Sequence, residues 1–142
     1  MSSPLDSYAE YSRLIFSLLA DHPSIESHTL AIYTASQTVG ITRGEIVFRK
    51  GYTLTVLEQI DFVAHTILNY FYELDQGEER LWWYDPMPHP NVPELQSTHP
   101  HHKHIPPDIK HHRIPAPNIS FTEPNLQKLI DEVELLIKNT SP

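Results

Sequence analysis

Histidines crowd one short stretch of the chain. His99, His101, His102 and His104 lie within six residues, with Lys103 among them. Imidazole is the side chain best suited to proton transfer near neutral pH, so such a cluster can supply both a general base and a general acid. In an extended segment alternate side chains point to opposite sides, so His102 and His104 would share one side, and His101 and Lys103 the other. We expect the functional site here.

Three chemistries fit these residue types. In the first, the site cleaves RNA: one histidine removes the 2′-hydroxyl proton, another protonates the leaving oxygen, and Lys103 or Arg113 stabilises the phosphorane charge. In the second, two or three histidines bind a divalent metal, with Asp85 or Asp108 as the carboxylate ligand. In the third, the segment is a binding surface for a partner protein, held extended by its prolines. The structural alternative is that the histidines are solvated or bond loop carbonyls.

Asp85 extends the candidate site, because it directly follows Tyr84 at the end of an expected strand; a turn-capping role is its alternative. The histidine spacing matches no zinc signature, so we expect no cofactor and no metal ligands, with a divalent metal kept as an alternative. The residues expected to be catalytic are His99, His101, His102, Lys103, His104 and Asp85.

The segment around these residues differs from the rest of the chain. Ten of the thirteen prolines fall between Pro86 and Pro124, and seven of the ten histidines between His89 and His112. Proline lacks the N–H and fixes φ, so this density argues against helix and interior strand. The formal net charge is −8, which makes the chain a poor generic binder of nucleic acid, but this segment is near neutral or basic. A loop of this length in a small protein is usually functional or disordered, and the histidines favour function.

Regular elements flank the segment. Apolar residues at helical spacing predict a helix over residues 4–20 and another over 123–138. Alternating, β-branched and aromatic stretches predict an antiparallel meander over 28–85, with Leu68, Tyr70, Tyr72 and Leu74 on one face of its fourth strand. The expected strands cover residues 28–35, 38–48, 53–62, 65–74 and 79–84. We therefore expect one α+β domain over 1–142: a curved antiparallel sheet of about five strands, both helices packed on it, and a Pro/His-rich functional loop over 86–122.

Composition narrows the class of protein further. The chain has 142 residues and no cysteine, which excludes disulfides, thiolate zinc sites and a cysteine nucleophile. The N-terminus lacks the basic start and apolar run of a signal peptide, and no apolar stretch approaches the roughly 18 residues of a membrane span. We expect a cytoplasmic protein that does not contact a membrane. Aromatic residues on both faces of a small sheet favour a homodimer.

Several motifs together resemble a known family. They are Gly44-Glu45-Ile46-Val47-Phe48, Gly51-Tyr52-Thr53-Leu54 with Glu58, Tyr84-Asp85, His89-Pro90, His99-Pro100-His101-His102-Lys103-His104, and a helix opened by Pro124-Asn125-Leu126. Through these motifs the chain resembles the TumE family of prokaryotic toxin–antitoxin proteins. The most specific element is the Pro-His-His-Lys-His run.

The resemblance implies a toxin neutralised by a cognate antitoxin protein, with RNA as the candidate substrate. Through it, Tyr84 and His89 join Arg113 as expected substrate-binding residues. The alternatives are a non-enzymatic protein-binding module and a histidine-loop metal-binding protein. The chain departs from the family pattern at Trp83, where an arginine often stands, and at Lys50-Gly51-Tyr52, where Asp-Gly-Ser is common. The histidine-rich tail after His111 has no counterpart in the pattern.

Overall fold

The structure is a computed structural model that describes residues 3–140 of the chain. The helices are α1 (Tyr8–Asp21) and α2 (Leu126–Asn139), with short 3₁₀ helices η1 (Pro4–Asp6), η2 (Arg49–Gly51) and η3 (Pro93–Thr98). The strands are β1 (Ile25–His28), β2 (Ala31–Thr34), β3 (Val39–Phe48), β4 (Tyr52–Asp61), β5 (Thr66–Gln76), β6 (Glu79–Asp85), β7 (His102–His104) and β8 (Arg113–Pro115). None of the described helices is both long and apolar enough to cross a membrane.

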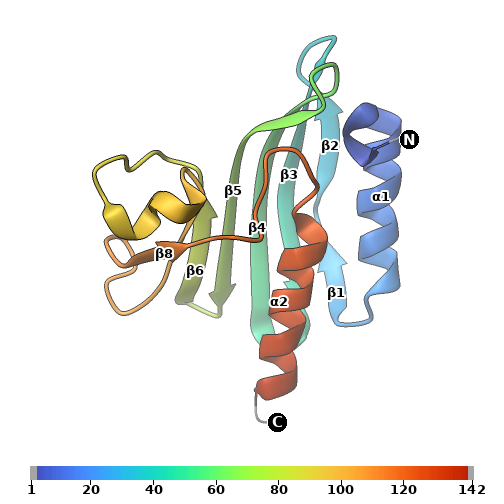
Figure 1. The fold of residues 1–142 in the computed structure, drawn as a ribbon. Coiled ribbons are helices and arrows are strands. Elements are labelled where there is room, and N and C mark those ends of the chain that lie inside the picture. Colours follow the sequence, from blue (N-terminus) through green and yellow to red (C-terminus); the bar gives the residue numbers. More distant parts are fainter. Residues whose placement is uncertain (1–2, 141–142) are drawn as a thin grey trace.

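All eight strands belong to one open antiparallel sheet. Its order is β1-β3-β4-β5-β6-β7-β8, and β2 pairs with β3 beside β1. The α+β class, with a helix at each end of the chain, is confirmed (Figure 1). The predicted number of about five strands was too low. One extra strand comes from a break in the first predicted strand, and two come from the proline-rich segment.

Gly44 explains the break between β1 and β2. Its φ is +146°, and a Cβ placed on it would lie 2.5 Å from the Thr29 carbonyl oxygen, so the backbones approach each other where only glycine fits. Here the pairing with β3 changes from Ala31 opposite Arg43 to His28 opposite Ile46. A prediction from residue types does not detect such a break in the strand.

Both helices lie on the same face of the sheet, as predicted. α2 crosses in front of the central strands and α1 lies beside it (Figure 1). The two helices and the inward side chains of β3 to β6 form one buried hydrophobic cluster. Within it, the Tyr11 hydroxyl of α1 and the Tyr72 hydroxyl of β5 each donate a 2.5 Å hydrogen bond to the buried Glu58 carboxylate. Asn125 donates to the Tyr72 hydroxyl in turn, which connects α1, the sheet and the start of α2.

Neither α1 nor α2 lies over the opposite face of the sheet, which we call the open face. Leu57 is 43% exposed there. A bulge adds Leu68 to the exposed residues, because the β4–β5 register shifts between Gln59 opposite Asn69 and Ile60 opposite Ile67. The prediction that Leu68 shares the inner face with Tyr70 was therefore wrong: Ile67 is buried, and Leu68 is 46% exposed.

The proline-rich segment extends the sheet rather than only looping over it. β7 contains no proline and pairs on both sides, with β6 and with β8, so the expectation that this segment holds no interior strand was wrong. Pro115 lies in β8, the edge strand, where a missing N–H costs no ladder hydrogen bond. The prolines thus stand outside the positions that need two-sided pairing, and the histidine run becomes part of the sheet.

Candidate functional site

The pairing of β6 with β7 assembles the site. Asp85 is opposite His102 and Trp83 is opposite His104. Residues directly opposite each other in a sheet project to the same face, and so do residues two apart along a strand. All four side chains therefore share one face, which is the face without helices. The alternation predicted for His102 and His104 is found in the structure.

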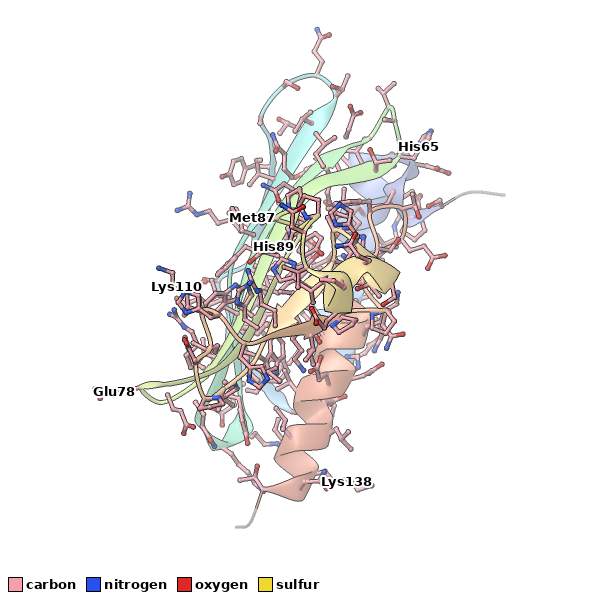
Figure 2. The ribbon with its side chains drawn as sticks, turned by 60° about the vertical axis from the view of Figure 1, so that its left-hand side comes forward. His65, Glu78, Met87, His89, Lys110 and Lys138 are labelled. Atoms are coloured by element: carbon pink, nitrogen blue, oxygen red, sulfur yellow. The ribbon has the colours of Figure 1, made fainter. Side chains whose placement is uncertain are left out.

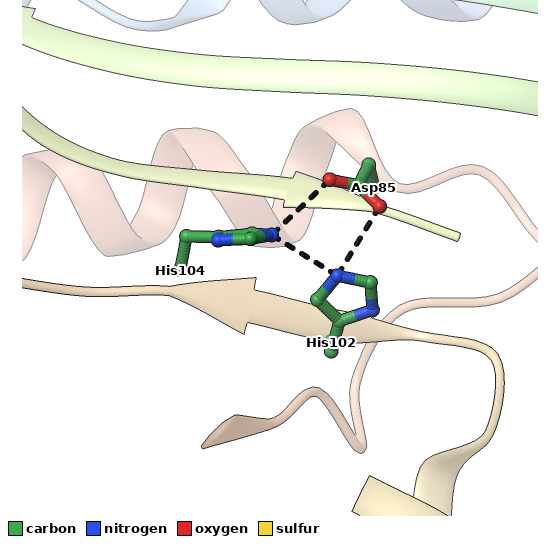
Figure 3. A group of neighbouring side chains, drawn as sticks. All are labelled: Asp85, His102 and His104. Carbon is green, nitrogen blue, oxygen red and sulfur yellow. Dashed lines mark hydrogen bonds and ion pairs between the residues drawn. The ribbon is translucent and has the colours of Figure 1, made fainter. Parts of the chain in front are cut away.

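Three polar side chains converge at the end of β6 (Figure 3). His102 Nε2 lies 3.1 Å from His104 Nε2. The Asp85 carboxylate closes the triangle, with Oδ1 3.2 Å from His102 Nε2 and Oδ2 3.3 Å from His104 Nε2. We call Asp85, His102 and His104 the central cluster. The two rings are buried, His102 at 1% and His104 at 5% exposure, while the Asp85 side chain is 21% exposed.

Hydrogen bonds fix the orientation of every member. His102 Nδ1 lies 3.1 Å from the Pro100 carbonyl oxygen, and His104 Nδ1 lies 2.8 Å from the Ile109 carbonyl oxygen. A carbonyl oxygen only accepts, so each Nδ1 carries the hydrogen and each Nε2 faces the cluster. Asp85 is held from behind by two donors: the Trp83 indole N–H at 2.8 Å and the Met87 backbone N–H at 2.9 Å.

The pKa values of Asp85 and His104 are shifted by different causes. Burial alone raises the pKa of Asp85, but hydrogen bonds from His102, the Met87 backbone and Trp83 outweigh it and hold that pKa well below its ordinary value. Burial lowers the pKa of His104, against the raising effects of the Ile109 carbonyl and the Asp85 charge. The centre therefore combines a firmly ionised carboxylate with a buried ring that favours its neutral form.

Aromatic and basic groups surround the central cluster. The Trp83 ring stacks on His104 with 4.0 Å between centroids. The His89 ring meets His102 edge-on at 4.8 Å, and Arg113 Nη1 lies 3.0 Å from His89 Nε2. Burial and the Arg113 charge lower the pKa of His89. Two of the expected substrate-binding residues, His89 and Arg113, thus lie beside the expected catalytic residues.

A pocket adjoins Asp85 on the open face. Its volume is about 600 Å³, and its walls include Phe71, Trp83, Arg80 and Met87. The Arg80 guanidinium lies 6.0 Å from the Trp83 ring centroid and forms an ion pair with Glu73 at 2.7 Å. Figure 2 turns this edge of the sheet forward and shows Met87 and His89 on the segment that leaves β6. Asp85 is the member of the central cluster that lines the pocket.

Lys103 and Tyr84 point to the other face of the sheet. They are opposite each other in the β6–β7 pairing, and both contact Glu132 of α2. The Lys103 ammonium pairs with Glu132 Oε1, and the Tyr84 hydroxyl donates to Oε2 at 2.7 Å. Burial and the Glu132 charge raise the pKa of Tyr84. The structure therefore places the predicted catalytic lysine and the predicted substrate-binding tyrosine in a strand–helix contact, away from the central cluster.

His101 and His99 also lie apart from the central cluster. The Tyr70 hydroxyl and His101 Nδ1 are 2.6 Å apart, and the two rings stack at 5.7 Å. Phe121 packs on the His101 ring at 4.5 Å, and burial lowers the pKa of His101. His99 is exposed where η3 ends. Of the six residues predicted to be catalytic, the structure brings together Asp85, His102 and His104.

A family model described as toxin TumE matches residues 15–137, which is most of the chain. The chain belongs to the TumE toxin family. The resemblance seen in the sequence is thereby confirmed. No curated protein and no solved structure matches the chain.

In this TumE-family chain, the motif positions divide by their place in the sheet. Asp85, His102 and His104 form the central cluster, with His89 beside it, whereas Tyr84 and Lys103 anchor α2. Trp83, which stands where the family often has arginine, stacks on one histidine and donates to the carboxylate.

Sequence reasoning did not assign Trp83 to the site. The signal was available, since Trp83 and Asp85 are two residues apart in a strand and so share a face. The Pro100 and Ile109 carbonyls that orient the histidines were also missed. These contacts depend on how the proline-rich segment folds back on itself, and residue types do not encode that.

Proposed function

We propose that this protein is a toxin of a toxin–antitoxin system that acts on RNA at the central cluster. One observation carries the proposal: two imidazole Nε2 atoms and a carboxylate converge beside a pocket walled by aromatic rings. Phosphodiester cleavage needs groups that move protons between the 2′-hydroxyl and the leaving oxygen, and imidazoles at hydrogen-bond distance from each other supply them. RNA as substrate implies action in the cytoplasm.

The surroundings of the central cluster suit a nucleotide. Aromatic rings bind bases of any sequence by stacking, and the Phe71 and Trp83 rings form part of the pocket wall. Arg80 at the pocket and Arg113 beside His89 supply cationic groups for a phosphate. The acidic net charge of the chain disfavours long contacts with an RNA backbone, so we expect recognition of a few nucleotides rather than of an extended duplex.

A neutralising antitoxin is the partner we propose for the open face of the sheet. Phe71 lines the pocket next to Asp85 and also the two smaller hollows that contain Leu57. A protein seated on Leu57 and Phe71 would therefore also cover the approach to the central cluster. A homodimer through the same face is the alternative, and the mass of the isolated protein in solution distinguishes the two.

Toxicity tests the proposal in cells. Expression without the neighbouring antitoxin gene should arrest growth, and His104→Asn should abolish the arrest. Asparagine can still donate to the Ile109 carbonyl, so the variant removes Nε2 while keeping the local hydrogen bond. The matched control replaces the exposed His111 and His112 by asparagine and should stay toxic. A folded His104→Asn protein as toxic as the wild type would overturn the proposal.

Purified protein tests the reaction itself. Wild type should cleave single-stranded RNA, and His104→Asn should not. If both leave RNA intact while the wild type still arrests growth, the toxin binds a target without cleaving it. The exposed Leu57 and Leu68 on the sheet favour that second function, a protein-binding module.

A further inference from the structure

The central cluster places acceptor atoms against one another. Since both Nδ1 atoms donate to backbone carbonyls, the ring atoms of His102 and His104 left to offer a lone pair are the two Nε2 atoms, which face each other across 3.1 Å. The two carboxylate oxygens of Asp85 face the same pair of atoms, with Oδ1 3.2 Å from His102 Nε2 and Oδ2 3.3 Å from His104 Nε2. Converging lone pairs in a buried place repel unless something positive lies between them. A proton forms a covalent bond with only one of the two Nε2 atoms. A divalent cation can be coordinated by both.

We propose that Asp85, His102 and His104 bind one divalent transition-metal ion, with zinc as the ion that fits best. The spacing supports this choice. Ligand atoms at about 2.0–2.1 Å from a zinc ion stand about 3.3 Å apart at the corners of a tetrahedron. The two Nε2 atoms are 3.1 Å apart, and each lies 3.2 or 3.3 Å from one of the two Asp85 oxygens, so the separations are close to the edge length of a zinc tetrahedron.

The hydrogen bonds around the ligands are those of a metal site. Histidines that bind a metal through one ring nitrogen usually donate the other N–H to a carbonyl or carboxylate, which fixes the ring. Both His102 and His104 do so here. A carboxylate has about four lone-pair positions. On Asp85, the Trp83 and Met87 N–H groups occupy two of them from outside, and the other two face the histidines.

The donor set selects the class of ion. Two imidazoles and one carboxylate suit zinc and similar transition metals, while magnesium and calcium prefer oxygen ligands throughout. Structural zinc sites usually have four protein ligands, whereas sites that act on a substrate keep a position open. Three ligands, one of them lining the pocket, match the second kind. Metal binding stands on this geometry alone, and a role in RNA cleavage rests on the proposed function. An Nε2 atom that binds the ion cannot also move a proton, so at an occupied site the ion would replace the two histidines in that role.

A second group of possible ligands provides an internal comparison. His22, Asp131 and Glu134 also come together, near the end of α1. There the His22 Nε2–Glu134 Oε1 distance is 3.8 Å, and Asp131 is exposed and bonded to Gln127. The groups are spread apart and already partnered. This second group therefore serves as a control for adventitious binding rather than as a site.

Metal content of the full chain, purified with a tag that contains no histidine, tests the inference. We expect close to one equivalent of zinc after dialysis, and visible absorption bands of a low-symmetry site when cobalt replaces it. His104→Asn and Asp85→Asn should each lose the zinc and the cobalt bands. The matched control, with asparagine at both His111 and His112, should keep them, and so should His22→Asn. Added zinc should raise the Tm of the wild type and of the controls, but not of His104→Asn.

The outcomes separate the inference from the proposed function. Zinc retained by folded His104→Asn and Asp85→Asn, or lost in the His111/His112 control, overturns the metal site. RNA cleavage by wild type that holds no zinc, absent in His104→Asn, also overturns it while supporting the proposed function. One equivalent of zinc in a wild-type protein that neither cleaves RNA nor arrests growth supports the metal site and overturns the proposed function.

Discussion

Lys103 offers the sharpest contrast between its place in the sequence and its place in the structure. It stands between the two histidines of the central cluster, yet its side chain crosses to the opposite face and pairs with Glu132. The ammonium lies 5.2 Å from the Trp82 ring centroid and 5.4 Å from that of Tyr84. Lys103→Met keeps a long apolar stem over these rings and removes only the charge. We expect this variant to remain toxic but to be less stable.

The expected loss of stability follows from the burial of the pair. The side chains of Lys103 and Glu132 are 19% and 28% exposed. Exposed ion pairs contribute about 0.2–1 kcal/mol, and breaking a fully buried pair costs about 3–5 kcal/mol. This pair lies between the two cases, and Glu132 keeps the hydrogen bond from the Tyr84 hydroxyl. We therefore expect Lys103→Met to lower the free energy of unfolding by about 1–2 kcal/mol.

Urea unfolding followed by circular dichroism at pH 7 measures this change, and growth arrest on expression measures function. Lys110→Met is the control, because the Lys110 side chain is exposed. The control should change the free energy of unfolding by less than about 0.5 kcal/mol. If Lys103→Met has wild-type stability but no longer arrests growth, Lys103 acts on the substrate and the reasoning from its face of the sheet fails.

Two further predictions concern the core and the open face. Burial raises the pKa of Glu58, so the native chain holds this proton more tightly than the unfolded chain, and stability falls as the pH rises above the ordinary value of 4.5. Glu58→Gln should reduce the dependence of the unfolding free energy on pH by up to ~1.4 kcal/mol per pH unit. If the difference in unfolding free energy between wild type and variant stays constant from pH 4 to 8, this prediction is wrong. Leu57→Glu, on the open face, should weaken antitoxin binding at least tenfold by calorimetry without loss of toxicity. Leu135→Glu, on the exposed side of α2, should leave binding unchanged, and equal affinities for both variants would exclude the open face as the antitoxin surface.

The parts of the fold that follow a regular period could be predicted from the sequence. Both helices, and the strands β3, β4 and β6, lie within a few residues of the predicted ranges, because burial imposes a period of 3.6 or 2 on the apolar residues. The failures are local departures from a period. The bulge at Leu68 adds one residue, so the side chains on its two sides no longer follow one alternation between the faces of the sheet. The close approach of the backbones at Gly44 divides one predicted strand into two.

The sequence predicted where in the chain the site lies, but not which of its side chains contact one another. Alternation correctly joined His102 to His104 and separated them from Lys103. The same argument should have removed Lys103 from the expected catalytic residues, since a side chain on the other face cannot reach the same substrate atom. Its partner Glu132 comes from a helix far along the chain, and the sequence contains no sign of that contact. In the sequence Trp83 stood out only as a departure from the family pattern, whereas in the structure its indole N–H binds the carboxylate.

The β6–β7 pairing has a consequence for how this family can diversify. Asp85 ends one strand and His102 begins the next, and their register places the side chains of the central cluster on one face of the sheet. The chain between them leaves the sheet, forms η3 and returns, while Met87 and Pro88 line the pocket near where it departs. Insertions and deletions between His89 and Pro100 can therefore reshape the rim while Met87, His89 and Pro100 keep their contacts with the central cluster. Related toxins could in this way acquire different target preferences, and escape one another's antitoxins, while inheriting the same chemistry.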